Sequence, residues 1–351
     1  MTLLAQYTTL GLGGPARTLI TAASDDAVID AVRVADTAAD PVLILGGGSN
    51  LVIADDGFPG TAVHVDTRGI SYARGTARAG IVEVTVAAGE NWDDVVAATI
   101  AEGLAGLECL SGIPGRAGAT PIQNVGAYGQ EVADAITSVR ALDRRTGEIT
   151  LLTSADCQFS YRDSMFKRAS GRYLVLAVTL ALPDEKLSRP VRYAELAATL
   201  GVETGDRVPC ADAREAVLAI RGRKGMVVSP DDPDSRSAGS FFTNPVVDAA
   251  QIARVEAIAE GRGLGAVPRF DAGDGHFKLP AAWLIERSGF AKGYGTPGGA
   301  RVSAKHTLAL VNGGAATTQT LLALAREIVA GVRQAFGVTL EPEPILVGVA
   351  L

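Results

Sequence analysis

The sequence predicts an α+β protein built from two or three packed lobes. Its 351 residues exceed the length of one ordinary domain, which is about 100 to 200 residues. Hydrophobic residues make up 47% of the chain and charged residues only 20%, a composition typical of a well-buried globular protein. Strand-like and helix-like segments alternate along the chain, and two glycine-rich turns interrupt them. We therefore expect several lobes and little disorder.

The first third of the chain has the pattern strand, helix, strand. RTLITAAS (residues 17–24) is apolar and β-branched, which predicts a strand. Ser24 can cap the helix that follows, and Asp25 and Asp26 suit the positive end of that helix. PVLILGGGSN (residues 41–50) predicts a buried strand that runs into a glycine turn.

A second block predicts a mixed αβ lobe. TAVHVDT (61–67) and IVEVTVAAG (81–89) read as strands, and Asn91 can cap a helix that Gly103 ends. Two more strand candidates follow, SVRALDRRTGEITLLT (138–153) and RYLVLAVTLAL (172–182). The first of them contains a hairpin signal at residues 145–147.

The last third predicts a separate lobe that contains a long helix. VVSPDDPDSRSAGS (227–240) has the composition of a connection, so we expect a domain change near residue 223. A helix is expected at 249–261, an apolar segment at 279–290 and a strand at 307–314. A longer helix should run from Thr318 to Phe336, because its apolar residues share one face and Gly337 follows.

Charge and cysteine content exclude several classes of protein. The net charge of −7 and the scattered lysines and arginines give no basic patch for nucleic acid or an anionic membrane. The cysteines, Cys109, Cys157 and Cys210, are far apart, so we expect reduced core residues and no metal site. The N-terminus lacks a signal-peptide pattern, and no apolar run reaches the ~20 residues of a membrane span. We therefore expect a cytoplasmic protein.

Two glycine-rich segments are the strongest candidates for a ligand site. LGGGSN (45–50) alone is as well explained by a tight turn as by a phosphate-binding loop. Leu51 replaces the third glycine of a Rossmann fingerprint, and no P-loop motif occurs. SGIPGRAGATPIQNVGAYGQE (111–131) adds five more glycines among apolar residues. Two separated glycine loops suit an elongated cofactor, with its phosphates on one and its ring against the other.

Seven ordered motifs carry a family resemblance. They are GGGSNLVIADDGFPGT, GLECLSGIPGRAGATPIQNVGAYGQE, FSYRDSMFK, IRGRK, AGSFFTNP, KLPAAWLIERSGFAKG and LEPE. In order and spacing the chain resembles the UDP-N-acetylenolpyruvoylglucosamine reductases, the MurB family, in the longer form with a tyrosine loop. The resemblance implies a PCMH-type FAD-binding fold of two lobes plus a C-terminal α/β substrate-binding lobe. We expect lobe 1 at residues 1–67 with a strand at 344–351, lobe 2 at 68–222 and the substrate lobe at 223–343.

The resemblance also assigns residues to the cofactor. It implies non-covalent FAD, with NADPH as co-substrate. The expected FAD-binding residues are Gly46, Gly47, Gly48, Ser49, Asn50, Leu51, Ser111, Gly112, Ile113, Pro114, Gly115, Gly118, Ala119, Ile122, Gln123, Asn124, Gly126, Ala127 and Arg221.

Three residues match the family's catalytic groups. Arg162 in SYRDS and Glu343 in LEPE match the pair that stabilises the enolate-like intermediate. An arginine fork suits a carboxylate, whereas a carboxyl group helps only if it is protonated or hydrogen-bonded to the charged form. Ser240 in AGSFFTNP matches the proton donor. Without the motifs, Arg162 would be read as an ion-pair partner of Asp163, and Ser240 as a turn residue.

Four residues are expected to bind substrate. Lys224, Asn244 and Tyr193 match groups that meet the phosphates, and Tyr128 supplies a further polar contact. Tyr193 would close over the diphosphate as part of a mobile loop. Glu341 is a rival of Glu343. Pro344 and Ile345 stand where relatives often carry Val and Arg, so a substrate contact from that arginine is absent.

The expected reaction is reduction of UDP-N-acetylglucosamine enolpyruvate to UDP-N-acetylmuramate, a step of cell-wall peptidoglycan synthesis. Hydride would pass from flavin N5 to the enolpyruvyl methylene carbon, and Ser240 would protonate C2. We expect a monomer. Two rivals are another PCMH-type FAD oxidase, for which His64 and Cys109 are the candidate flavin attachment points, and a non-catalytic UDP-sugar-binding protein.

Overall fold

The structure is a computed structural model, and it describes residues 2–75 and 79–351. The chain forms two compact units, each of which is described by itself. The first unit is built mainly from Ala16–Gly48 and Pro59–Arg223. The second unit contains Leu3–Pro15, Ser49–Phe58 and Lys224–Leu351. The predicted division into three lobes stays a prediction.

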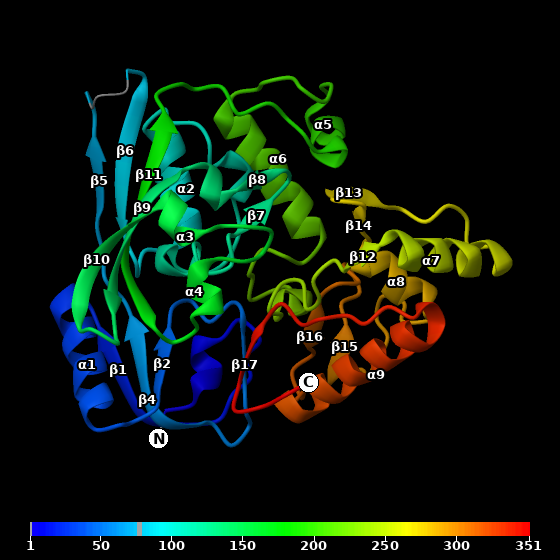
Figure 1. Cartoon of the computed structure of the whole chain (residues 1–351), viewed down its shortest axis with the longest axis horizontal. Helices are drawn as coiled ribbons and strands as arrows, with labels where there is room; N and C mark the ends of the chain where they lie inside the picture. Colours follow the sequence, from blue (N-terminus) through cyan, green and yellow to red (C-terminus); the bar gives the residue numbers. More distant parts are fainter. Residues whose placement is uncertain (1, 76–78) are drawn as a thin grey trace. The chain divides into compact units, whose positions relative to one another are not determined.

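The first unit begins with a three-stranded sheet of order β1-β4-β2. Its strands are β1 (Ala16–Ala22), β2 (Val42–Leu45) and β4 (Phe58–Val65), and α1 (Asp25–Thr37) lies beside β1 (Figure 1). The Oγ of Ser24 accepts a hydrogen bond from the Ala27 N–H, which fixes the start of α1. The predicted strand, helix and strand are therefore confirmed.

A five-stranded antiparallel sheet follows, with strand order β10-β9-β11-β6-β5. Its strands, in chain order, are β5 (Ile70–Ala73), β6 (Ile81–Ala87), β9 (Ile136–Asp143), β10 (Glu148–Thr153) and β11 (Tyr173–Pro183). Along the chain, α2 (Trp92–Ala101) comes between β6 and β9. The Asn91 side chain caps α2 by accepting a hydrogen bond from the Asp93 N–H. The β9–β10 hairpin turns at the predicted residues 145–147. Sheet and helices share one core, in which Trp92, Leu110 and Leu142 are fully buried.

The rest of the first unit is a set of short elements and two helices. α5 (Ala194–Leu200) packs on α6 (Cys210–Arg223) through a small second core that includes Leu196, Val217 and Ile220. The short elements are η2 (Glu108–Leu110), η3 (Ala117–Ala119), β7 (Gly126–Ala127), β8 (Gln130–Glu131), η4 (Val132–Asp134), α3 (Ser154–Cys157) and α4 (Met165–Arg168).

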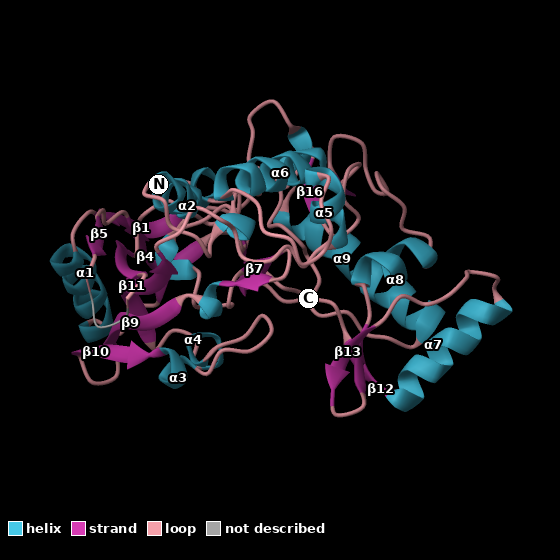
Figure 2. Ribbon diagram, turned by 90° about the horizontal axis from the view of Figure 1, so that it is seen from above, coloured by secondary structure: helices cyan, strands magenta, loops and turns pink. Residues whose placement is uncertain are grey.

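The second unit is organised around α9 (Thr318–Phe336), which has the predicted bounds. It contacts α7 (Ala249–Gly261), α8 (Ala281–Arg287), β15 (Ala300–Val302) and β16 (Leu310–Asn312). Figure 2 shows α8 between α7 and α9. The core of this unit includes Phe241, Phe242 and Phe336. Its elements are η1 (Leu4–Tyr7), β3 (Leu51–Ile53), η5 (Pro233–Ser235), β12 (Val246–Asp248), α7 (Ala249–Gly261), β13 (Phe270–Gly273), β14 (His276–Lys278), α8 (Ala281–Arg287), β15 (Ala300–Val302), β16 (Leu310–Asn312) and β17 (Ile345–Val347).

Chain segments far apart in sequence meet in the second unit. β17 pairs in parallel with β3, with Ile345 opposite Leu51 and Val347 opposite Ile53. β12, β14 and β13 form a small antiparallel sheet, and β15 pairs with β16. Within residues 2–75 and 79–351, no helix is long and apolar enough to cross a lipid bilayer.

Candidate functional site

The two glycine-rich segments lie in contact in the first unit. A Cβ atom at Gly47 would lie 2.7 Å from the Cα of Gly115. A Cβ at Gly46 would lie 3.4 Å from the Cβ of Arg116. Carbon atoms that are not bonded to each other prefer separations of about 3.5–4.0 Å. Glycine is therefore required at residue 47, because any side chain there would force the two turns apart.

The second glycine segment runs along residues 88–92. The Trp92 N–H donates to the Gly115 carbonyl at 3.1 Å, and the Ala117 N–H donates to the Glu90 carbonyl at 2.9 Å. The Gly118 N–H donates to the Ala88 carbonyl, also at 2.9 Å. A Cβ at Gly118 would lie 2.5 Å from the Cβ of Ala88. These contacts fix the segment against the start of α2, so main-chain hydrogen bonds hold the turn in place.

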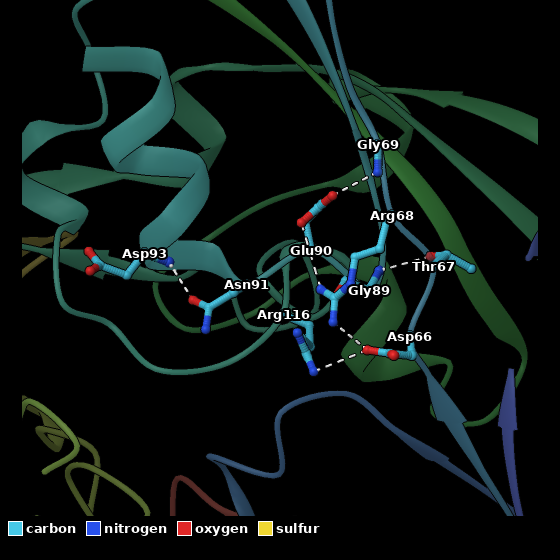
Figure 3. Close-up of polar contacts among 9 residues, drawn as sticks. All are labelled: Asp66, Thr67, Arg68, Gly69, Gly89, Glu90, Asn91, Asp93 and Arg116. Carbon is cyan, nitrogen blue, oxygen red and sulfur yellow. Dashed lines mark hydrogen bonds and ion pairs between the residues drawn. The ribbon is translucent and has the colours of Figure 1, made fainter. Parts of the chain in front are cut away.

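Arg116 connects the same segment to a network of charged residues (Figure 3). Its Nη2 lies 3.3 Å from Oδ1 of Asp66, which also pairs with Arg68. Arg68 lies 3.7 Å from Glu90, whose other oxygen accepts the Gly69 N–H at 2.7 Å. Burial lowers the pKa of Arg116, and nearby Arg68 adds to this effect. Arginine nevertheless stays protonated in proteins, so a positive charge lies beside the glycine turns.

Asp93 fixes the beginning of the second glycine segment. Its Oδ1 accepts the Gly112 N–H at 2.6 Å, and its Oδ2 accepts Nη2 of Arg214 at 2.9 Å. Burial alone would raise the pKa of Asp93, but the hydrogen bonds from Arg214 and Gly112 outweigh it and the pKa lies below its usual value. Asp93 is therefore a charged anchor in the first turn of α2.

The Arg162 turn is the second special feature of the first unit. Arg162 has φ +53°, a left-handed conformation that is unusual for a residue other than glycine. Its guanidinium donates to the carbonyls of Asn124 (3.2 Å) and Gly126 (2.6 Å), and Nζ of Lys167 donates to its carbonyl at 2.9 Å. Asp163, the rival partner suggested by the sequence, pairs with Arg168.

Asn124 joins the Arg162 turn to the second glycine segment. Its Nδ2 donates to Oε2 of Glu131 at 2.7 Å and to the Ser160 carbonyl at 3.0 Å. Its Oδ1 accepts the Ala133 N–H at 3.1 Å. Asn124 and Tyr128 also have positive φ, +42° and +49°. Strained backbone of this kind gathers at functional sites, and Asn124, Tyr128 and Arg162 are three of the six such residues other than glycine that the structure records.

Tyr128 packs against the small second core, Tyr193 meets its ring, and Arg221 lies in α6. The Tyr128 and Tyr193 rings meet edge to face with centroids 5.6 Å apart, and Tyr193 is 48% exposed. Burial raises the pKa of Tyr128 to about 12, although Arg221 opposes this effect. Arg221 is only 6% exposed, and burial lowers its pKa while Tyr128 and Asp93 raise it. Tyr128 therefore stays a hydrogen-bond donor at neutral pH.

In the second unit the structure brings Ser240 and Glu343 onto neighbouring segments. Phe242 and Pro342 form an antiparallel bridge, and the Glu343 N–H donates to the Phe241 carbonyl at 2.9 Å. Glu343 is half-buried, whereas Glu341 is exposed. Nδ2 of Asn50 lies 3.4 Å from the Glu343 carbonyl. The two segments that supply Ser240 and Glu343 are thus fixed by main-chain hydrogen bonds.

The remaining expected site residues lie on several elements. Oδ1 of Asn244 accepts the Ala281 N–H at 2.9 Å and so fixes the start of α8. Lys224 is half-buried and directly follows α6. Oγ of Ser111 donates to the Glu108 carbonyl at 2.7 Å. Ile113, Ile122 and Ala127 pack against the main core of the first unit. The other expected cofactor residues are placed as follows: Gly48, Ser49 and Pro114 in the turns, Leu51 in β3, Ala119 exposed at the end of η3, and Gln123 buried.

Three residues near this site, Asp93, Glu108 and Arg116, were not predicted from the sequence. Each acts through partners far along the chain, such as Arg214 for Asp93 and Asp66 for Arg116. Only the placement of Asp93 in the first turn of a helix gave a local signal. In the part of the chain that the structure describes, no cluster of side chains has the composition of a metal site.

The glycine turns fit a flavin nucleotide, because side-chain-free backbone lies next to a guanidinium and polar residues. Residues 16–153, which include both turns, match a family model described as an FAD binding domain. The chain is thus an FAD-binding protein of mixed α and β structure, related to the PCMH-type flavoproteins, which confirms the expected fold class.

Further comparisons identify the family. Residues 231–347 match the C-terminal domain of UDP-N-acetylenolpyruvoylglucosamine reductase. The chain is 58% identical to the reductase of that name from Streptomyces coelicolor, over 99% of this chain and 90% of the relative. It is 55% identical to that of Thermobifida fusca, over 99% and 97%. The crystal structure of the reductase (MurB) from Thermus caldophilus matches with a TM-score of 0.64 and 25% identity, over 99% and 97%. The chain belongs to the UDP-N-acetylenolpyruvoylglucosamine reductase family.

Proposed function

We propose that this chain is an FAD-dependent oxidoreductase that reduces UDP-N-acetylglucosamine enolpyruvate to UDP-N-acetylmuramate with NADPH. The main support is the identity of 58% to a reductase of this name over almost the whole chain. The FAD-binding match spans both glycine turns, and the C-terminal match spans Ser240, Asn244 and Glu343. The product is a precursor of peptidoglycan, so the enzyme serves cell-wall synthesis, cell shape and cell division.

FAD is held without a covalent bond by the two glycine turns. The residues proposed to hold it are those of Gly46–Leu51 and Ser111–Ala127 named above, together with Arg221. Bound there, FAD would supply the two-electron hydride chemistry that links NADPH to the methylene carbon of the enolpyruvyl group. The close contact between Gly47 and Gly115 supports this proposal, because it leaves no room for a side chain where the two turns meet.

Arg162 and Glu343 stabilise the charge that develops during the reduction. Hydride addition to the methylene carbon places negative charge on C2 and on the neighbouring carboxylate. The planar Arg162 guanidinium can bind a carboxylate with two parallel hydrogen bonds. In the described conformation it donates to the carbonyls of Asn124 and Gly126, so substrate would replace neutral acceptors with a charged one.

Ser240 donates the proton that completes the reduction at C2. A serine hydroxyl is a weak acid, but protonation of a carbanion is favourable enough that position matters more than acidity. Ser240 is half-buried and lies two residues from the Phe242–Pro342 bridge. Its oxygen recovers a proton from solvent after each turnover, and NADPH is the two-electron reductant of the overall reaction.

Four residues bind the nucleotide part of the substrate. Lys224 supplies a point charge and Asn244 an amide donor to the diphosphate. Tyr193 donates from its phenol, and Tyr128 supports the Tyr193 ring through the edge-to-face contact. We further propose that the enzyme works as a monomer in the cytoplasm, where NADPH is available, and binds neither nucleic acid nor membrane, which the net charge of −7 supports.

Purified protein offers a direct test of this function. We expect a yellow protein whose flavin band bleaches on anaerobic addition of NADPH and recovers on addition of UDP-N-acetylglucosamine enolpyruvate, with UDP-N-acetylmuramate identified by mass spectrometry. Acid should release the flavin into the supernatant. A colourless protein would refute the proposal. So would a flavin that oxygen reoxidises but the enolpyruvyl substrate does not, since that behaviour defines an oxidase.

A further inference from the structure

Glu108 is a fully buried carboxylate outside the groups assigned so far. Its exposed fraction is 0%, and it lies in η2 of the first unit, just before the second glycine segment. Oε2 accepts the Gly106 N–H at 2.7 Å. Oε1 accepts both Nε2 of Gln130 at 2.9 Å and the Arg189 N–H at 2.6 Å. An ionised carboxylate only accepts hydrogen bonds, so three N–H donors match its chemistry.

These three partners belong to separate parts of the site. Gly106 precedes η2, from which the chain enters the second glycine segment. Gln130 begins β8, two residues after Tyr128, and its Oε1 accepts the Cys109 N–H at 3.0 Å. Arg189 lies in the long segment between β11 and α6 that carries Tyr193. Glu108 therefore ties the cofactor side of the site to both tyrosines.

The segment that carries Tyr193 is closed at its base. The Cys210 N–H donates to the Lys186 carbonyl at 2.9 Å, and the Ser188 N–H donates to the Val208 carbonyl at 2.7 Å. The Val191 N–H donates to the Asp206 carbonyl at 2.8 Å. We call residues 186–191 and 205–210 the neck of this segment, and residues 192–204, which include Tyr193 and α5, its head.

The head is held against the protein mainly through α5, which packs on α6. Leu196 and Ala197 of α5 pack in the small core with Cys109 and Val191. Tyr193 itself is 48% exposed and contacts the Tyr128 ring by its edge. The position of the Tyr193 phenol therefore depends on the neck together with α5, and Glu108 is the buried carboxyl group that the neck binds.

We propose that Glu108 is a positioning residue for substrate binding, which holds the neck through Arg189 and so places Tyr193 over Tyr128. This proposal rests on the proposed role of Tyr193 in binding the UDP-sugar substrate. Glu108 touches neither the reacting atoms nor the nucleotide in this account. Its effect should appear in the KM for the UDP-sugar and in the dynamics of the neck, and not in the reduction of the flavin by NADPH.

The substitution Glu108→Gln tests the acceptor pattern at constant size. An amide group would place its own N–H groups against at least one of the three donors. We expect the KM for the UDP-sugar to rise about tenfold, which corresponds to a loss of ~1.4 kcal/mol of binding free energy. Hydrogen exchange of the peptides covering the neck, residues 186–191 and 205–210, should also accelerate about tenfold. FAD content and the rate of flavin reduction by NADPH should change less than about twofold.

A double-mutant cycle with Tyr193→Phe separates positioning from a general structural effect. If Glu108 acts through Tyr193, Glu108→Gln should raise the KM much less in the Tyr193→Phe background than in the wild type. Equal effects in both backgrounds would overturn the proposal, as would unchanged exchange in the neck. A wild-type KM for Tyr193→Phe alone would instead contradict the proposed role of Tyr193, while the exchange measurement would still decide whether Glu108 holds the neck.

A second variant covers the case in which Glu108→Gln does not fold. Arg189→Pro removes the N–H that Glu108 accepts and leaves the carboxylate with its Gly106 and Gln130 donors. We expect the same pattern, a higher KM with normal flavin reduction and faster exchange in the neck. A wild-type KM together with wild-type exchange would overturn the proposal.

Discussion

Replacing Gly47 with alanine should push the two glycine turns apart and weaken FAD binding. The new Cβ would lie 2.7, 3.1 and 3.4 Å from Cα, C and N of Gly115, all of them backbone atoms that cannot rotate away. Restoring an ordinary carbon–carbon separation requires a movement of about 1 Å. Overpacking of this kind costs about 1–3 kcal/mol. If FAD needs both turns in their present positions, most of this cost should appear in its affinity.

We therefore expect Gly47→Ala to raise the dissociation constant of FAD at least about tenfold, which corresponds to ~1.4 kcal/mol. Titration of the apo-protein with FAD, followed by flavin fluorescence, measures this constant directly. Gly46→Ala should have a smaller effect, because its Cβ would meet side-chain atoms and not backbone, Cβ and Cγ of Arg116 at 3.4 Å and Cβ of Ala119 at 4.0 Å.

Gly261→Ala is the matched control for this series. Gly261 is in the last turn of α7, and a Cβ there would meet nothing within 4 Å. This control should leave FAD binding unchanged. If Gly47→Ala bound FAD as tightly as Gly261→Ala, the two turns could not be the cradle of the cofactor.

Three further predictions concern charge and titration. Burial raises the pKa values of Cys109, Cys157 and Cys210 to about 12 each. An Ellman assay at pH 8 should therefore find no rapidly reacting thiol in the native enzyme and three after denaturation. A rapidly reacting thiol in the native enzyme would contradict this. Asp93→Asn should lower the free energy of unfolding by about 1–2 kcal/mol at pH 7, because the Arg214 guanidinium loses its carboxylate partner. The pKa of Asp93 is lowered in the folded protein, so its stabilising contribution is present at neutral pH and is lost as the pH falls through that pKa. The melting temperatures of wild type and variant should therefore converge at low pH. A constant difference between them would disprove the stabilising role of the Asp93 carboxylate. Arg116→Ala should weaken FAD binding about tenfold at low salt and less at high salt, because salt screens the attraction between the guanidinium and the FAD phosphates. Arg17→Ala, which breaks the exposed Arg17–Asp40 pair, should not weaken FAD binding, and equal losses in the two variants would show a non-specific charge effect.

Local patterns in the sequence predicted the regular elements well. Ser24 and Asn91 cap α1 and α2 as expected, and α9 runs from Thr318 to Phe336, followed by Gly337 with φ +69°. Capping, periodicity and turn chemistry involve residues only a few positions apart, which is why one sequence is enough to recognise them.

Contacts between distant residues could not be predicted in this way. Glu108 binds Gln130 and Arg189, which lie 22 and 81 positions away along the chain. Arg116 meets Asp66 across 50 positions. Neither glutamate nor arginine carries a local signal for such partners, and both are usually exposed. The expected mobile loop around Tyr193 is, in the structure, a segment with a hydrogen-bonded neck and a helix in its head.

The candidate site residues also divide into those that the sequence could predict and those that only the structure shows. The glycine segments could be found from composition, but the close approach of Gly47 to Gly115 became visible only in three dimensions. Arg162, Ser240 and Glu343 were found through family motifs, since an arginine, a serine and a glutamate have no distinctive spacing of their own. The left-handed backbone at Arg162 and the bridge between Phe242 and Pro342 are structural observations that support them.

Single-turnover reoxidation of the reduced enzyme tests the proposed chemistry most directly. The Ser240→Ala variant, with the exposed Ser170→Ala as its control, is first reduced by NADPH and then mixed anaerobically with UDP-N-acetylglucosamine enolpyruvate in a stopped-flow instrument. We expect Ser240→Ala to be reduced at the wild-type rate and to be reoxidised at least about a hundredfold more slowly, while Ser170→Ala matches the wild type in both steps. Reoxidation of Ser240→Ala at the wild-type rate, or equal loss in both half-reactions, would contradict the account.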